Sequence, residues 1–326
     1  TTVAEFTVGP GERVPFVLTW FRSHEPPPQA IDPEQALTDT AHYWHEWAGA
    51  CHHHGPYHEE IHQSLLVLKA LTYEPTGGIV AAPTTSLPEW IGGVRNWDYR
   101  YCWLRDATLT LMAMLAAGYR DEALAWREWL LRAVAGDPAD VQIMYGIAGE
   151  RRLAEYDLDW LPGFENSRPV RVGNAASRQR QLDVYGEVLD AAYLTRATGA
   201  EASEYGWSLL KHVLAWLEVG WRETDAGIWE VRGPNRHFTH SKVMAWVAFD
   251  RGVRAAEATG LPAGVSAWRR EREAVRADVL ARGYDEAIGA FVQSYGAKHT
   301  DAANLLLPIV GFIDANDPRM RGTIDL

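Results

Sequence analysis

Residues 96–106 combine aromatic and charged side chains at the start of an apolar segment. They hold four aromatic residues and two Arg/Asp sets, and an almost entirely small or apolar run, 107–117, follows directly. A helix that is apolar on all sides is buried on all sides. Because the helix dipole is positive at its N-terminus, Asp106 suits that end and Arg105 needs another role. Aromatic faces pack on sugar rings and Arg/Asp pairs bind hydroxyl groups. The segment therefore predicts a pocket for a neutral polyhydroxylated ligand; a buried salt bridge that pins the turn is the alternative.

A second candidate segment is the glycine-flanked loop 227–233, which contains Trp229 and Glu230. A carboxyl group beside an indole is partly desolvated, which raises its pKa and suits it to donate a proton. Glu230 is therefore a candidate general acid. A loop glutamate paired with Arg232 or Arg236 would be the structural alternative.

Glu187 is the alternative candidate for the proton donor. It follows Asp183 on an otherwise apolar predicted helix, where an unpaired acid would be costly. A buried ion pair with an arginine such as Arg105 would explain it equally well.

The segment His58 to His62 matches the zinc-protease pattern H-E-x-x-H. On a helix the two histidines would share a face and bind zinc, with Glu59 as the base. The segment offers no third ligand at a recognisable spacing, and three further histidines, 52–54, lie just upstream. Surface histidines at a helix start are the simpler interpretation, so a zinc hydrolase stays an alternative.

Composition narrows the class of partner. The net charge of -12 gives no support for nucleic acid or an anionic membrane as a partner. The two cysteines form no disulfide framework, which favours a reducing, cytoplasmic compartment. No apolar stretch is long enough to span a membrane. The 15 tryptophans fit both helix packing and a carbohydrate site.

The elements that must position these residues are mainly helices. Residues 2–20 cluster β-formers around a Gly-Pro-Gly turn, which predicts a hairpin, and a proline-rich linker ends at residue 28. Apolar helices then alternate with amphipathic ones, joined by short turns, while long loops lead to the next pair. Such alternation suits a ring of inner and outer helices whose long loops gather on one face. The helical part is expected to start over 33–51, with Asp39 or Thr40 as a possible cap. The helices expected after it are 57–73, 107–117, 121–135, 183–198, 203–219, 241–259, 266–282 and 301–313, with no helix after 317.

Several of these segments resemble glycoside hydrolase family 15, the glucoamylases and the related bacterial and archaeal trehalases. Trp103 to Asp106 resembles the site that binds the terminal glucose, and Trp229-Glu230 resembles the general-acid segment. Gln181 to Asp183 resembles the polar segment that lines the pocket between them. Segments 81–89 and 238–244 are similar to the bacterial branch in particular.

The resemblance implies a fold and an activity. It implies an (α/α)6 toroid over 29–326, preceded at 1–28 by the last strands of an N-terminal β-sandwich domain. It implies hydrolysis of a terminal α-glucoside, from trehalose or a malto- or isomalto-oligosaccharide, with inversion. Glu230 would be the acid, and neither a metal nor an organic cofactor is needed. The substrate-binding residues would be Trp103, Arg105, Asp106, Gln181, Asp183 and Trp229.

The sequence also departs from the family pattern. About eight helices are expected in place of twelve, and no acid after Glu230 lies in the family's base context, so we expect an incomplete toroid. Its uncovered apolar faces would favour self-association into a homo-oligomer. Val231 stands where fungal glucoamylases have a second acidic residue. This difference favours the trehalase-like branch of the family over the starch-degrading one. A non-catalytic sugar-binding fragment is the other interpretation.

Overall fold

The computed structural model describes residues 3–197, 199, 204–261 and 263–326. They divide into two units, Thr1–His62 and Gln63–Leu326. Residues 1 and 2 of the expected hairpin region, and residues 198 and 203 at the ends of two expected helices, lie outside the described part.

The first unit contains the expected hairpin region and one helix. Its turn is formed, because the amide of Glu12 donates to the carbonyl of Gly9 over 3.2 Å, and the rings of Phe6 and Phe16 lie 5.4 Å apart. Residues 3–20 nevertheless form no paired strands. Two strands without a partner sheet are marginal in water, so the assignment of 1–28 to a sandwich stays a prediction. Helix α1 (Pro33–Gly49) begins where the Asp32 carboxylate accepts from the amides of the first turn.

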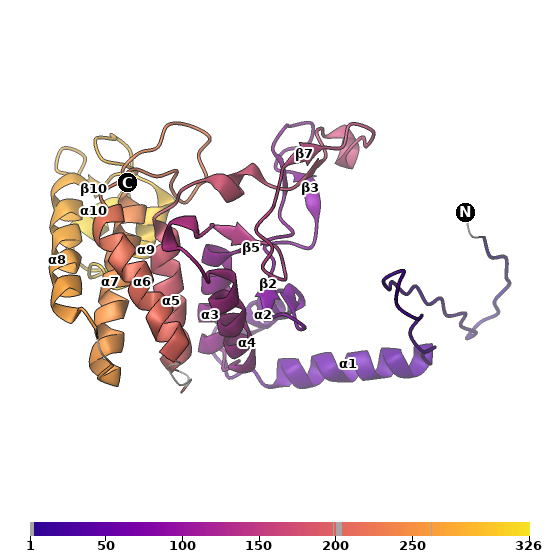
Figure 1. The fold of residues 1–326 in the computed structure, drawn as a ribbon. Coiled ribbons are helices and arrows are strands. Elements are labelled where there is room, and N and C mark those ends of the chain that lie inside the picture. The colour runs from indigo at the N-terminus through magenta and orange to yellow at the C-terminus, as the bar shows by residue number, and fades with distance from the viewer. Residues whose placement is uncertain (1–2, 198, 200–203, 262) are drawn as a thin grey trace. The chain divides into compact units, whose positions relative to one another are not determined.

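The second unit is built from paired helices, as the sequence predicts. In Figure 1 the helices α3 to α8 stand side by side, with the long loops above them. Helix α5 packs against both α3 and α7, and α4, α6 and α8 lie on these three helices. This is the alternation of inner and outer helices expected for a toroid. The helices are α2 (His58–Ala70), α3 (Leu104–Ala116), α4 (Asp121–Ala133), α5 (Asp183–Ala197), α6 (Glu204–Gly220), α7 (Thr239–Thr259) and α8 (Val265–Arg282).

Burial separates the inner helices from the outer ones. Helix α7 is buried on all sides along Thr239–Val253, whereas α8 buries Trp268, Val275 and Val279. The expectation that α3 is buried on every side is wrong in part, because Leu109 is 45% exposed. Apolar residues commonly remain at a surface, so composition alone did not reveal this open side.

The strands are short and lie in the loops. Each belongs to a two-stranded antiparallel sheet that pins a loop rather than forming a core. The pairs are β1 (Thr72–Tyr73) with β2 (Gly78–Ile79), β3 (Thr85–Pro88) with β4 (Asn96–Asp98), β5 (Cys102–Trp103) with β6 (Met144–Tyr145), β7 (Tyr156–Asp157) with β8 (Arg171–Val172), and β9 (Tyr284–Asp285) with β10 (Ala290–Phe291).

The end of the chain differs from the prediction of one helix over 301–313. The structure has a 3-10 turn, η4 (Ala302–Leu305), a single turn α9 (Leu306–Ile309), and then Gly311 with a φ of 81°. A further helix, α10 (Pro318–Asp325), follows and was not expected. Asp317 caps it and Pro318 occupies its first turn. Asp-Pro therefore starts a helix here, as proline at N1 allows.

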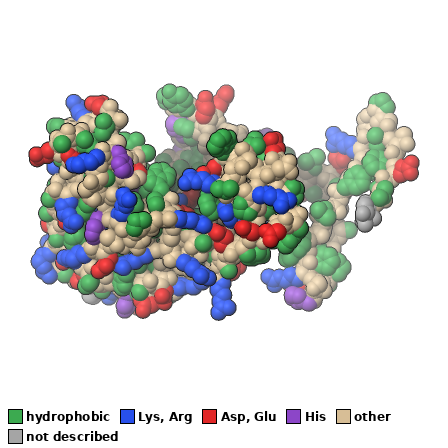
Figure 2. All heavy atoms as spheres, turned by 90° about the horizontal axis from the view of Figure 1, so that it is seen from above, with side chains coloured by type: hydrophobic (Ala, Val, Ile, Leu, Met, Phe, Trp, Pro, Cys, Tyr) green, Lys and Arg blue, Asp and Glu red, His purple; other side chains and the backbone are tan. Residues whose placement is uncertain are grey.

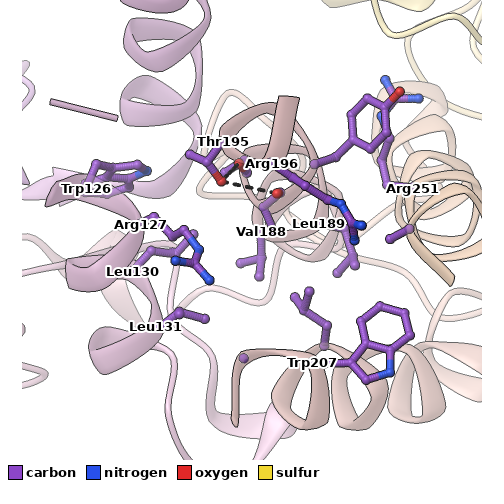
Figure 3. A pocket seen from close by; sticks show the side chains of 16 residues that line it. Trp126, Arg127, Leu130, Leu131, Val188, Leu189, Thr195, Arg196, Trp207 and Arg251 are labelled. Atoms are coloured by element: carbon purple, nitrogen blue, oxygen red, sulfur yellow. Dashed lines mark hydrogen bonds between the residues drawn. The ribbon is translucent and has the colours of Figure 1, made fainter. Parts of the chain in front are cut away.

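An apolar cavity of about 60 Å³ lies among α4, α5, α6 and α7. Figure 3 shows Trp126, Val188 and Trp207 around it. Its lining is mostly aliphatic and aromatic, which makes it unsuited to a sugar. In the part of the chain that the structure describes, no helix is long and apolar enough to cross a membrane.

Candidate active site

The first part of the site is the junction between β5 and α3. Trp103 ends β5 with 2% of its surface exposed, and the amide of Leu104 donates to the carbonyl of Ile143 over 3.0 Å. Arg105 and Asp106 follow in the first turn of α3. Strand β5 and the buried Trp103 indole thus fix the position of the first turn of α3, and with it the positions of the Arg105 and Asp106 side chains.

Three acceptors explain why Arg105 stands at a helix N-terminus. Its Nε donates to Oδ2 of Asp106 over 3.0 Å, and its Nη1 donates to the carbonyl of Ile228 over 2.7 Å. Its Nη2 lies 3.7 Å from Oε1 of Glu230. The unfavourable dipole position is offset by the two charge-assisted hydrogen bonds, each of which contributes about 1.5–3 kcal/mol, and by the longer ion pair with Glu230. Arg105 therefore links α3 to the loop that contains Glu230.

The second part is the loop 225–236, which we name the acid loop. Its ends are joined, because Asp225 and Arg236 exchange backbone hydrogen bonds of 3.0 and 2.9 Å. Gly227 has a φ of 72°, and a Cβ there would lie 2.7 Å from the Phe238 ring, so only glycine fits. Glu230 has a φ of 54°. A left-handed residue other than glycine costs on the order of 1–3 kcal/mol and is often found at functional sites.

The Glu230 carboxyl group is held by residues distant in sequence. Trp103 Nε1 donates to its Oε1 over 2.6 Å, and Gln179 Nε2 donates to its backbone carbonyl over 3.1 Å. Because an indole N–H can only donate, Oε1 is kept as an acceptor. A proton on this carboxyl group is therefore directed to Oε2.

Burial raises the pKa of Glu230 above its ordinary value, and the nearby Asp106 carboxylate raises it further. Arg105, the Trp103 hydrogen bond and Arg232 oppose that rise. The side chain is 21% exposed, so it is sheltered yet reachable. Such a carboxyl group stays protonated to a higher pH than a free glutamate, which is what a proton donor needs.

These residues line one cavity of about 860 Å³. That volume lies within the range usual for small-molecule sites. Figure 2 shows acidic and basic side chains interspersed over the helical body rather than gathered by sign. The lining combines aromatic rings with paired charges, which suits a neutral polyhydroxylated ligand. Among the lining residues are Trp97, Tyr99, Trp103, Arg105, Asp106, Arg171, Asn174, Trp229, Glu230 and Arg232.

The other sequence candidates lie behind or beside this cavity. Gln181 lines a neighbouring cavity of about 420 Å³ and donates to Gln179 over 3.3 Å. Asp183 is 1% exposed, and burial raises its pKa to about 7. Glu187 is 6% exposed, and burial together with Asp183 raises its pKa well above the ordinary value. Asp183 and Glu187 both interact electrostatically with Arg105. Their buried carboxyl groups therefore lie behind the cavity and act on it through Arg105.

The histidine pattern does not form a metal centre in the described residues. The rings of His58 and His62 lie 4.5 Å apart, and His58 Nδ1 contacts the carbonyl of His53 at 2.8 Å. No group of three or more His, Cys, Asp or Glu side chains able to hold a metal ion occurs in the described ranges. The surface interpretation therefore fits this segment.

Sequence reasoning missed four contacts that shape the site. Gln179 bonds the backbone of Glu230, and Arg171 and Arg232 lie over the Trp97 ring at 4.6 and 4.4 Å. Asp301 accepts the Trp229 N–H on both carboxylate oxygens, each at 2.9 Å. No local pattern pointed to these contacts, because each joins segments at least 51 residues apart.

Comparison with known proteins agrees with this geometry. A model of the family described as "Glycosyl hydrolases family 15" matches residues 55–326. A trehalase from Mycolicibacterium smegmatis is 42% identical over 320 residues, which cover 96% of this chain and 47% of that protein. A trehalase from Thermoplasma acidophilum is 40% identical over 288 residues, covering 88% and 49%. The chain thus spans about half the length of these curated relatives.

Solved structures show the same fold at low identity. A bacterial glucoamylase complexed with acarbose has a TM-score of 0.64 at 13% identity, covering 90% of this chain and 43% of that one. A glycosidase in complex with glucose has a TM-score of 0.64 at 17% identity, covering 82% and 67%. The helical layers therefore have a glucoamylase-like arrangement, consistent with the expected toroid.

Proposed function

This chain belongs to glycosyl hydrolase family 15, and we propose that it provides the glucose pocket and the general acid of a trehalase. The observation that supports this most directly is the Glu230 carboxyl group. It lies in a cavity with Arg105, Asp106 and three tryptophans, and burial raises its pKa.

Each pocket residue has a proposed role. Arg105 and Asp106 hold hydroxyl groups of the terminal glucose, and their own contact of 2.9 Å keeps the two groups in a fixed geometry. Trp103 and Trp229 form walls against the sugar ring. Gln181 and Asp183 support the pocket from behind. Trp229 is 57% exposed, so its ring has a free surface for this purpose.

The proposed reaction is hydrolysis with inversion. Oε2 of Glu230 gives its proton to the glycosidic oxygen as the bond from that oxygen to C1 breaks. A water molecule attacks C1 from the opposite face and loses its proton to a carboxylate, which lies roughly 6.5–9.5 Å from the acid in inverting enzymes. Asp301 is not assigned this role, because Oδ1 accepts from Trp229 and the Ala303 amide and Oδ2 accepts from Trp229 and Gln293, which leaves neither oxygen free for a proton. From the family resemblance we expect the base later in the fold than any acid of residues 231–326.

Trehalose is the proposed substrate rather than a starch fragment. The named relatives are trehalases, and Val231 removes the second acid that fungal glucoamylases place beside the general acid. Malto- and isomalto-oligosaccharides are the competing substrates to compare.

The test is Glu230→Gln, assayed in the protein that contains this chain. Loss of general-acid assistance predicts a fall in trehalose turnover of at least ~10²-fold, with trehalose binding retained. Glu187→Gln serves as the comparison variant. If Glu187→Gln has the large effect and Glu230→Gln a small one, Glu187 is the acid.

A sugar-binding fragment without hydrolytic activity is the second candidate. It is favoured because no acid after Glu230 lies in the family's base context. We expect residues 1–326 alone to bind glucose by calorimetry and to release none from trehalose. Steady glucose release by this chain, with its mass verified, would show that it contains the base.

A further inference from the structure

The acid loop holds Glu230 in a backbone conformation that it would not keep by itself. Its φ of 54° is left-handed, where a Cβ is crowded by the carbonyl oxygen. Contacts from outside the loop must therefore hold this residue in place. Besides the hydrogen bonds from Trp103, Arg105 and Gln179, two such contacts lie on either side of Glu230 in sequence, at Trp229 and at Arg232.

The contact before Glu230 joins Trp229 to Asp301. The indole Nε1 donates to both carboxylate oxygens, each at 2.9 Å. Asp301 is itself fixed, because it accepts from Nε2 of Gln293 over 2.6 Å and from the amide of Ala303 over 2.7 Å. The carboxylate thus ties the ring before the acid to the start of η4.

The contact after Glu230 joins Arg232 to Trp97 and Glu155. The Arg232 guanidinium carbon lies 4.4 Å from the Trp97 ring centroid, and Nη2 lies 2.9 Å from Oε2 of Glu155. A cation over an indole is attracted by the negative face of the ring. Trp97 is held in turn by Arg171 at 4.6 Å and by its hydrogen bond of 3.0 Å to Glu89.

We infer that these two contacts clamp the acid loop, and that Asp301 and Glu155 are positioning residues that act on Glu230 through Trp229 and Arg232. The inference rests on the proposed function, because it concerns the same proton donor. Neither carboxylate needs to touch substrate. Released on one side, the loop would relax toward right-handed backbone and move the carboxyl group away from Trp103. Misplacement of about 1 Å can cost ~10²-fold in rate.

Hydrogen exchange on the 326-residue chain tests the clamp without any assay of activity. We expect Glu155→Ala and Asp301→Ala to speed amide exchange across 225–236 by at least ~10-fold, while exchange in α7 stays unchanged. Glu155→Gln and Asp301→Asn keep acceptor atoms and should recover part of the protection. Glu257→Ala is the matched control, because it removes the ion pair with Arg269 between α7 and α8. Unchanged exchange across 225–236 in both alanine variants would overturn the inference.

A pair of substrates then tests positioning of the acid in the protein that contains this chain. Trehalose needs its leaving oxygen protonated, whereas an α-glucosyl fluoride leaves with little help. We expect both alanine variants to lower kcat on trehalose by at least ~10-fold with KM little changed, and to lower kcat on the fluoride by less than ~3-fold. Equal losses on both substrates would overturn the positioning role.

The outcomes also separate this inference from the proposed function. If the wild-type protein hydrolyses no glucoside, the proposed function fails, and the exchange data still decide whether the clamp exists. If Glu230→Gln abolishes trehalose hydrolysis but neither clamp variant alters it, the proposed function stands and the clamp as a positioning device is overturned.

Discussion

Trp103 Nε1 donates to Oε1 of Glu230 over 2.6 Å, although the two residues are 127 positions apart in sequence. The bond joins the two halves of the site, the start of α3 and the acid loop. It also makes the two carboxyl oxygens unequal, because Oε1 accepts from the indole and Oε2 keeps the proton. As the proton leaves, the carboxylate that forms already has a donor on Oε1.

Trp103→Phe should remove this donor while keeping an aromatic wall. A hydrogen bond to the charged form lowers a carboxyl pKa, so its loss should raise the pKa of Glu230 further. The alkaline limb of kcat/KM, which reports the acid in the free enzyme, should move to higher pH. Loss of one charge-assisted bond should also lower kcat by roughly 10–100-fold.

Trp246→Phe is the matched control for that variant. Its buried indole N–H has no hydrogen-bond partner among the described residues, so the same ring exchange removes no bond. An alkaline limb that stays in place or moves to lower pH in Trp103→Phe would contradict the assignment.

Arg105→Ala and Asp106→Ala should each weaken glucose binding by at least ~10-fold, as loss of charged hydrogen bonds implies. Calorimetry measures the affinity, and far-UV circular dichroism checks that the helices remain. Asp317→Ala removes a similar Arg/Asp contact of 2.7 Å at the start of α10 and should leave glucose affinity unchanged. Unaltered affinity in either pocket variant would remove these residues from the binding site.

The local motifs singled out the two segments that form the centre of the candidate site. Trp103, Arg105 and Asp106 are consecutive or nearly so, and their place before an apolar helix showed that they begin it. Trp229-Glu230 lies between glycines, which indicated a loop. The structure brings both segments to one cavity. That meeting follows from the packing of α3, α5 and α7, and the family resemblance, rather than periodicity, pointed to it.

The contacts that hold the acid loop in place could not be predicted from sequence patterns. Asp301 was expected to begin a long helix, but Pro308 and Gly311 limit helical backbone there to short turns. Its link to Trp229 depends on how those turns pack. Gln179 and Arg232 lie in loops without periodicity, where tertiary contacts alone decide which way a side chain points.

Gly186→Ala should destabilise the fold despite alanine's better helix propensity. A Cβ at Gly186 would lie 2.4 Å from the carbonyl oxygen of Met244 on α7. Replacing a helical glycine by alanine gains about 1 kcal/mol, whereas overpacking costs about 1–3 kcal/mol and occasionally more. Because a backbone atom cannot move aside cheaply, we expect the clash to prevail and the thermal midpoint to fall by at least ~3 °C.

Gly49→Ala is the control for that substitution. It ends α1, and a Cβ there meets nothing within 4 Å, so its midpoint should be unchanged or slightly higher. A midpoint for Gly186→Ala equal to or above that of wild type would mean that α5 and α7 can separate without cost.

Asp183→Asn should make the free energy of unfolding less dependent on pH. Asp183 is 1% exposed, and its Oδ1 has no hydrogen-bond partner among the described residues. Burial, and then Asp225, raise its pKa from 3.8 to about 7. Between these values the unfolded chain releases a proton that the folded chain keeps, so this group favours unfolding increasingly as pH rises from about 4 to about 7. The integrated effect is on the order of 4 kcal/mol.

Urea unfolding at pH 4 and pH 8 measures this effect. Relative to wild type, Asp183→Asn should gain more stability at pH 8 than at pH 4.

His240→Asn, in the same layer of inner helices, should show the opposite pH dependence of the free energy of unfolding. Burial, and then Arg105, lower the pKa of His240 from 6.5 to about 4, so the unfolded chain takes up a proton that the folded chain refuses as pH falls through that range. Its gain, on the order of 3 kcal/mol, should therefore appear at pH 4 and be absent at pH 8. Equal shifts at both pH values in the Asp183 variant would show that the pKa of its carboxyl group is not raised in the folded protein.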